Sequence, residues 1–227
     1  MIKSAATGAV LALIAAAAQA PALAQDNQQQ GQQQGQQQGQ QQRHDYLGTL
    51  QAMNGSSLSG MVAFKTTDEG RLIASLGASD VSPGMHMAHI HGFTGENPGD
   101  ATCPTDDADA NDDGLIDLIE TEAVAGKTLV PLTGDPASLT IKGAKGYPRA
   151  DEDGSVLYLE TADIQTLEQA LQKAHGTPLA LDKRVVFIHG LPDGVDVPDS
   201  AQSLPDVPAR LTLPIACAEI EVKPIEE

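Results

Sequence analysis

The chain has 227 residues and a formal net charge of −18 at pH 7, with 31 acidic and 13 basic side chains. A surface this acidic argues against nucleic acids and anionic membranes as partners and favours metal cations. Aromatic residues make up only 3% of the chain and tryptophan is absent, so a core must be built from Val, Leu, Ile and Ala.

Residues 1–24 have the pattern of an export signal peptide. Lys3 supplies a positive charge, an Ala- and Leu-rich run follows, and Ala22-Leu23-Ala24 is a small-x-small cleavage site. The apolar run is too short to anchor the protein in a bilayer. We therefore expect an exported protein, periplasmic or secreted, whose mature chain begins near Gln25 and has no membrane anchor.

Residues 25–44 are dominated by Gln and Gly, which offer almost no apolar side chain to bury. Such a segment cannot offset its ordering entropy, so we expect a disordered linker. Residues 45–227 are long enough for one domain with its own core.

Short strands are predicted in this domain wherever β-branched and apolar residues lie between turn signals. They cover residues 46–50, 58–67, 71–81, 84–93, 128–132, 138–142, 156–160, 183–189 and 211–222. One helix is predicted at 166–174, with Thr166 as its N-cap and Gly176 as its stop. The pattern indicates an all-β antiparallel sandwich or barrel with one short helix and long loops.

The segment Gly84–Phe93 contains three of the six histidines of the chain. If it is a strand, the period of two places His89 and His91 on one face together with Met87, while His86 points to the other face. Two imidazoles in this arrangement can bind one transition metal. The alternative is that they are ordinary half-buried histidines.

Cys103 and Cys217 are the two cysteines of the chain, and both lie in the part expected to be exported. Because oxidation is the default outside the cytoplasm, we predict a disulfide between them. They have no Cys-x-x-Cys spacing, which argues against a thiolate zinc site or a redox motif.

Residues 109–120 match the calcium-binding loop of EF-hand proteins position by position. The expected ligands are Asp109, Asn111, Asp113, Leu115 through its carbonyl, Asp117 and Glu120. A solvated acidic loop, the alternative, has no need of Gly114 at the sharp turn. Pro104 and Gly99 precede the loop where an entering helix would be, so we expect an isolated structural calcium site rather than a sensor.

Together these residues resemble the copper-zinc superoxide dismutase superfamily over nearly all of the chain after the Gln-rich stretch. The resemblance rests on matching order and spacing of Gly60–Phe64, the His86-x-x-His89-x-His91 strand, Cys103, Val185–His189 and Ala216–Ile220. It implies an all-β Greek-key β-barrel of superoxide dismutase-like type.

The resemblance also implies roles for individual residues. It makes His89, His91 and His189 copper ligands and His86 a structural histidine, and it pairs Cys103 with Cys217. The fourth copper ligand stays open between Met85, Met87, His175 and water.

The chain departs from the family pattern in two places. No histidine lies between His91 and His175, where the remaining zinc ligands should be, so we expect no zinc site. Pro214 stands where the family has its guiding arginine. We therefore interpret the chain as a divergent member in which a calcium loop replaces the zinc loop.

The sequence favours an exported, non-catalytic copper-binding module with structural calcium. The first alternative is an active copper-dependent superoxide dismutase, with superoxide as its substrate. The second is an extracellular structural or adhesion domain of chordin-like type, in which the histidines only pack.

Overall fold

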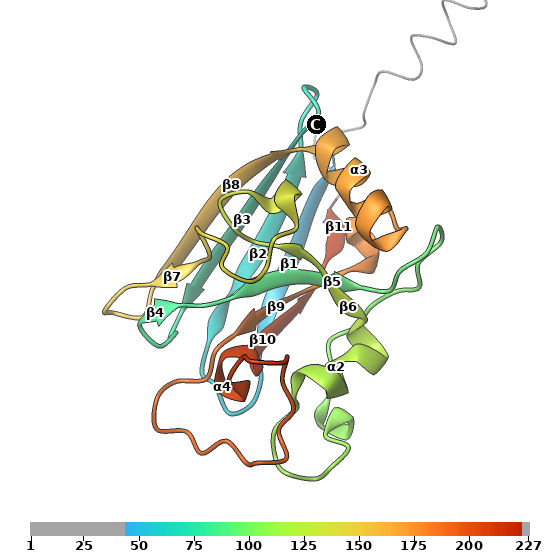
Figure 1. The fold of residues 1–227 in the computed structure, drawn as a ribbon. Coiled ribbons are helices and arrows are strands. Elements are labelled where there is room, and N and C mark those ends of the chain that lie inside the picture. The colour runs from blue at the N-terminus through green and yellow to red at the C-terminus, as the bar shows by residue number, and fades with distance from the viewer. Residues whose placement is uncertain (1–43, 224–227) are drawn as a thin grey trace, which may run out of the picture. The chain divides into compact units, whose positions relative to one another are not determined.

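The computed structural model describes residues 44–223, and the predicted signal peptide and nearly all of the linker lie outside them. The described strands are β1 (Asp45–Ala52), β2 (Ser59–Thr66), β3 (Arg71–Ser79), β4 (Gly84–Met85), β5 (Ala88–Gly92), β6 (Lys127–Pro131), β7 (Arg149–Ala150), β8 (Val156–Asp163), β9 (Val185–His189), β10 (Pro214–Glu219) and β11 (Glu221–Lys223). They form one antiparallel sheet that curls into a half-barrel (Figure 1).

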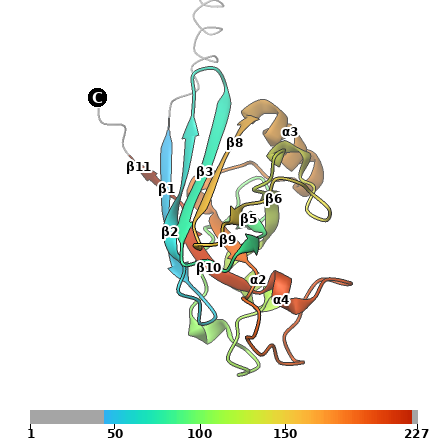
Figure 2. The same cartoon turned by 90° about the vertical axis from the view of Figure 1, so that its left-hand side faces the viewer.

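The strands follow the spatial order β4-β7-β8-β3-β2-β1-β10-β9-β5-β6, and β11 pairs with β1. Figure 2 shows β1, β2 and β3 on one side of the curled sheet and β5, β6 and β9 on the other. The mostly β, antiparallel architecture predicted from the turn and strand pattern is confirmed.

The helices are α2 (Leu118–Ala125), α3 (Ile164–His175) and the short α4 (Ala209–Thr212). The predicted helix corresponds to α3, which ends at Gly176 with a φ of 62° as expected. Its predicted N-cap is wrong, because β8 runs directly into the helix and the Asp163 carboxylate accepts the Thr166 N–H. The expectation of a single helix is also wrong, since α2 begins within the predicted calcium loop and α4 overlaps the start of the predicted strand 211–222. None of the described helices is long and apolar enough to span a membrane.

Two strand predictions need correction. Residues 138–142 form no strand, because a 3-10 turn at Pro136–Ser138 is followed by Leu139 in the left-handed region with a φ of 52°. The predicted closing strand 211–222 begins as the end of α4 and then divides into β10 and β11.

The inner face of the sheet carries the main core. Its fully buried side chains are mostly aliphatic, as the composition predicts, and include Val62, Leu76, Ile90, Val186 and Leu213. Burial of this aliphatic surface is the main favourable contribution to folding. On β5 and β9 the residues of this core alternate with residues that point to the opposite face.

The opposite face of β9 and β10 is covered by the segment between β5 and β6. Phe187 and Cys217 lie directly across from each other in the β9–β10 register and pack with Ala101 and Ile116 of that segment. The disulfide between Cys103 and Cys217 fastens the segment to β10, which confirms the predicted pairing.

Hydrogen bonds from Arg184 also hold the segment between β5 and β6 in place. Its side chain is only 1% exposed, and its guanidinium donates hydrogen bonds to the carbonyl oxygens of Phe93, Pro178 and Leu179 and to the Thr177 hydroxyl. These acceptors belong to two separate stretches of chain, so Arg184 joins the end of β5 to the turn after α3.

Candidate metal centre

Three histidines meet on the covered face of β5 and β9. In the β5–β9 register His89 lies across from Phe187 and His91 across from Val185. Because side chains alternate along each strand, His89 and His91 share a face with Val185, Phe187 and His189. The predicted turn at Ser82–Gly84 precedes this arrangement. The single strand predicted at 84–93 is wrong, because the chain divides into β4, which pairs with β7, and β5, which pairs with β9 and β6.

His89, His91 and His189 form a compact cluster, which we call the triad. One ring nitrogen of each lies within 4.8 Å of the corresponding nitrogens of the other two. All three side chains are buried, with at most 4% exposed. The three histidines that the sequence predicts as copper ligands are therefore brought together, and they could hold a metal ion.

Hydrogen bonds orient two of the rings. The His189 Nδ1 donates to the Thr212 carbonyl oxygen at 2.7 Å, so its Nε2 keeps a free lone pair. The His89 Nε2 lies 3.1 Å from the Tyr147 hydroxyl, which itself donates to the Ile141 carbonyl oxygen. Since the tyrosine proton is used there, His89 donates through Nε2 and its Nδ1 keeps the lone pair.

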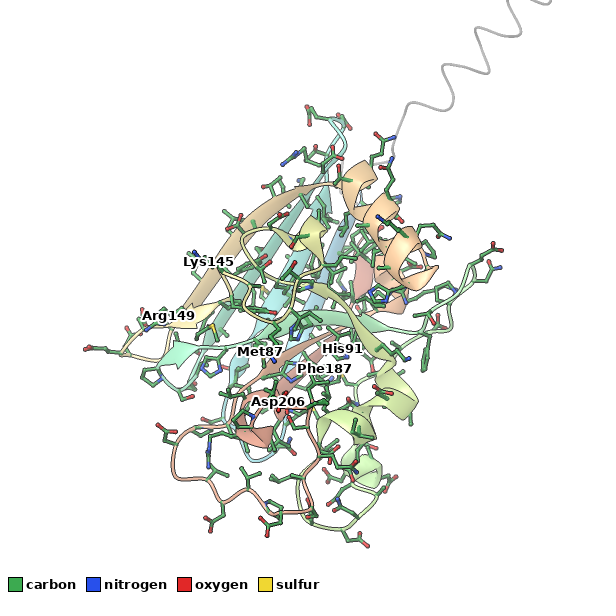
Figure 3. All side chains as sticks on the ribbon, viewed as in Figure 1. Met87, His91, Lys145, Arg149, Phe187 and Asp206 are labelled. Atoms are coloured by element: carbon green, nitrogen blue, oxygen red, sulfur yellow. A yellow bond between two sulfur atoms is a disulfide. The ribbon has the colours of Figure 1, made fainter. Side chains whose placement is uncertain are left out.

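The third ring is held by a hydroxyl and an aromatic contact. The His91 Nε2 lies 3.0 Å from the Thr128 Oγ1, and the Phe187 ring meets the imidazole edge-on with 4.8 Å between centroids. Figure 3 labels His91 and Phe187, which lie side by side.

The remaining nitrogen of each triad ring is buried without a hydrogen-bond partner. These atoms are the Nδ1 of His89, the Nδ1 of His91 and the Nε2 of His189. Buried polar atoms are normally paired, and three orphans of the same kind in one place need an explanation. A metal ion would satisfy all three, with hydrogen-bonded second nitrogens as in protein metal sites.

Burial keeps the triad neutral. Desolvation, followed by the charge of His189, lowers the pKa of His91 to about 3, although the Gly126 backbone opposes the shift. Desolvation lowers the pKa of His189 to about 4, against the hydrogen bond to Thr212. Desolvation and its two histidine neighbours hold the pKa of His89 well below its ordinary value. Neutral imidazole is the form that binds metals.

His86 lies next to the triad but belongs to a different network. Its Nδ1 donates to the His189 carbonyl oxygen at 2.9 Å, and its Nε2 lies 2.7 Å from the Ser82 carbonyl oxygen. It therefore connects the segment before β5 to the end of β9, where the third triad residue stands.

A pocket of about 310 Å³ opens beside His189. Its lining includes Met85, Met87, Lys142, Tyr147, His189 and Leu211. Of the predicted candidates for a fourth copper ligand, Met85 and Met87 lie in this pocket, whereas His175 is the last residue of α3 and does not line it.

Five of the six predicted calcium ligands lie in the loop before α2, and Glu120 lies in the first turn of α2. The Asp109 carboxylate accepts the N–H groups of Asp113 and Gly114, and Glu120 accepts those of Ala110 and Asp117. Glu120 thus ties the two ends of the loop together. Within residues 44–223, the carboxylates of this loop do not come together as the triad nitrogens do.

The Asp117 carboxylate has a role at the start of α2 that sequence reasoning missed. It accepts the N–H groups of Ile119 and Glu120 and forms a capping box with Glu120 at the start of α2. The spacing Asp117-x-x-Glu120 was the available signal for this helix.

Sequence reasoning also missed the residues that orient the triad. Thr212 acts through its backbone carbonyl, which no side-chain pattern reveals. Tyr147 lies far from the histidines in the chain, between Gly146 and Pro148, and no motif marks it. A comparison with protein-family models finds none that matches this chain, and a comparison with curated proteins finds no match either.

Proposed function

We propose that this protein is an exported copper-binding module with a superoxide dismutase-like barrel, and that it acts without catalysis. The observation that carries the proposal is the set of three unpartnered, buried ring nitrogens, one from each triad histidine. Three neutral imidazoles suit copper in either oxidation state. A packing-only role, as in a chordin-like structural domain, would leave these buried atoms unpaired at an energetic cost.

The strand order supports the barrel part of the proposal. β1, β2 and β3 form a meander, and β10 returns from the end of the domain to lie beside β1. A late strand that lies beside the first strand of a meander is the feature of Greek-key arrangements. The hydrogen bond from His86 to the His189 backbone supports a structural role for this histidine.

The disulfide supports export. A covalent bond between Cys103 and Cys217 is typical of an oxidising compartment, which agrees with the predicted signal peptide. Fractionation of cells that express the full chain tests this, and we expect the processed protein in the periplasm or medium. Unprocessed protein in the cytoplasm would contradict it.

Copper titration of the triad variants tests the function. We expect wild-type protein to bind one copper ion and His91→Gln and His189→Gln to lose most of that affinity. His175→Gln, on the half-buried last residue of α3, is the matched control and should bind as the wild type does. Equal, weak copper binding by the wild type and both triad variants would overturn the proposal.

A specific observation favours superoxide dismutation as a second candidate. The pocket beside His189 contains the exposed Lys142, and Lys145 and Arg149 (Figure 3) follow on the same connection between β6 and β8. A positive charge at a pocket mouth attracts an anion such as superoxide, and bound copper would supply the one-electron chemistry. Arg210 is not available for this, because it donates to the carbonyl oxygens of Pro192 and Val195.

A dismutase assay on copper-loaded protein separates the two candidates. If the rate does not exceed that of free copper, the result supports the binding module. A rate that falls with added salt and in Lys142→Gln, but not in Lys65→Gln on the distant strand β2, supports the enzyme.

We further propose a structural calcium ion at Asp109, Asn111, Asp113, Leu115, Asp117 and Glu120. The twelve-residue spacing and the closing contacts of Glu120 with Ala110 and Asp117 support it.

Thermal unfolding with and without calcium tests this site. We expect calcium to raise the melting temperature of the wild type but not of Glu120→Gln. Glu122→Gln, an exposed neighbour on α2, should respond as the wild type does. The same calcium response in all three proteins would rule the site out.

A further inference from the structure

We infer that Met87 and Met85 form a thioether route for Cu(I) into the triad, in which Met87 becomes the fourth ligand of the reduced ion. The inference rests on the proposed copper site and adds a metal oxidation state and two residues to it. Two of the five methionines of the chain lie within three residues of each other and line one pocket together with His189.

The strand register places Met87 at the corner of the triad. The His189 N–H donates to the Met87 carbonyl oxygen at 2.8 Å, which continues the β5–β9 pairing by one position. Met87 is therefore the cross-strand neighbour of His189. By alternation it lies on the same face as His89 and His91.

Met85 stands at the outer end of the same pocket. Its side chain is 52% exposed, so it does not fill the core as most methionines do. Met87 is half-buried and His189 is fully buried. Exposure therefore decreases from Met85 through Met87 to His189, three residues that line one pocket.

The chemistry of the lining favours the reduced ion. Thioether sulfur is a soft ligand that selects Cu(I) over harder cations. Apart from the exposed Lys142, the rest of the pocket is mainly apolar, with Ile141, Leu204 and Leu211 among its lining. An apolar surrounding and a nearby positive charge both favour the ion of lower charge. The buried, unpartnered Nε2 of His189 provides the first imidazole that an ion in the pocket would meet.

The first experiment measures Cu(I) affinity by competition with a chromophoric Cu(I) chelator, on the full mature protein. We expect Met87→Leu, a substitution of nearly equal volume, to weaken Cu(I) binding by about tenfold or more and to change Cu(II) binding little. We expect Met85→Leu to slow Cu(I) uptake. Met61→Leu, an exposed methionine on β2, is the control and should change neither quantity.

X-ray absorption of the Cu(I)-loaded protein gives an independent measurement. A sulfur atom in the first coordination shell of the wild type, lost in Met87→Leu, supports the inference. Absence of sulfur in the wild type, or unchanged Cu(I) affinity in Met87→Leu, overturns it. If His189→Gln also leaves Cu(I) affinity unchanged, the triad itself is not the copper site and the proposed function fails as well.

Discussion

The metal-free protein should lose stability between pH 7.5 and pH 5 because of the triad. The pKa of His91 is about 3 and that of His189 about 4, against an ordinary value of 6.5 for the unfolded chain. As the pH falls below 6.5, the unfolded chain takes up protons that the folded protein cannot accept. The stabilising contribution is therefore complete above pH 6.5 and declines on acidification.

The magnitude follows from the size of the shifts. At pH 5 the pH lies about 1.5 units below the pKa of each of these two histidines in the unfolded chain. Their protonation there stabilises the unfolded state by about 2 kcal/mol per histidine. Their sum of about 4 kcal/mol is a large fraction of the stability of an ordinary domain. Exposed carboxylates contribute little here, because most titrate below pH 5.

Urea unfolding of the metal-free protein at pH 7.5, 6 and 5 measures this loss. The control is the double variant His91→Gln/His189→Gln, whose stability should vary much less over the same range. A wild-type free energy of unfolding that is equal at pH 7.5 and pH 5 would refute the reasoning. So would an equal decline in the double variant.

Three further predictions concern the segment between β5 and β6 and the contacts that hold it in place. The double substitution Cys103→Ser/Cys217→Ser should lower the free energy of unfolding by about 4 to 5 kcal/mol, because the disulfide closes a loop with a sequence separation of 114. Equal denaturation curves with and without reductant would contradict this. The substitution Arg184→Met should lower the free energy of unfolding in urea by about 3 kcal/mol or more, since it leaves the carbonyls of Phe93, Pro178 and Leu179 without their buried donor. A change near zero would mean that water replaces the guanidinium. Gly126→Ala should destabilise clearly more than Gly55→Ala, because both glycines have positive φ but only a Cβ at position 126 would collide with the Gly92 backbone; similar melting temperatures would disprove that contact.

The sequence predicts two of the three triad histidines because strand periodicity is a local property. Alternation places His89 and His91 on one face of β5 without any knowledge of the rest of the chain. His189 was added by a family resemblance, and the β5–β9 register then brings it beside them. The Thr212 carbonyl and Tyr147 were beyond reach, because their contacts depend on how α4 and the β6–β7 connection pack over the site.

The errors in the strand and helix predictions have local causes too. The segment 138–142 has strand-like composition, yet Pro136 and the left-handed Leu139 fix a turn, and such a conformation for leucine is set by its surroundings. For α2, one pair of residues serves two patterns: Asp117 and Glu120 fit both the calcium loop and a capping box. Because the two residues were interpreted as calcium ligands, the helix that begins at Leu118 was not predicted.

The strand order sets the order in which the metal centre can assemble during synthesis. A nascent chain that reaches residue 189 already contains all three triad histidines, but it lacks Thr212, which orients the His189 ring, and β10, which pairs with both β9 and β1. The β1–β10 pairing joins the two ends of the domain, so it forms late and slowly. Any metal ion that the triad holds should therefore be loaded after the chain is complete, because a partly made chain has no preformed site to capture it.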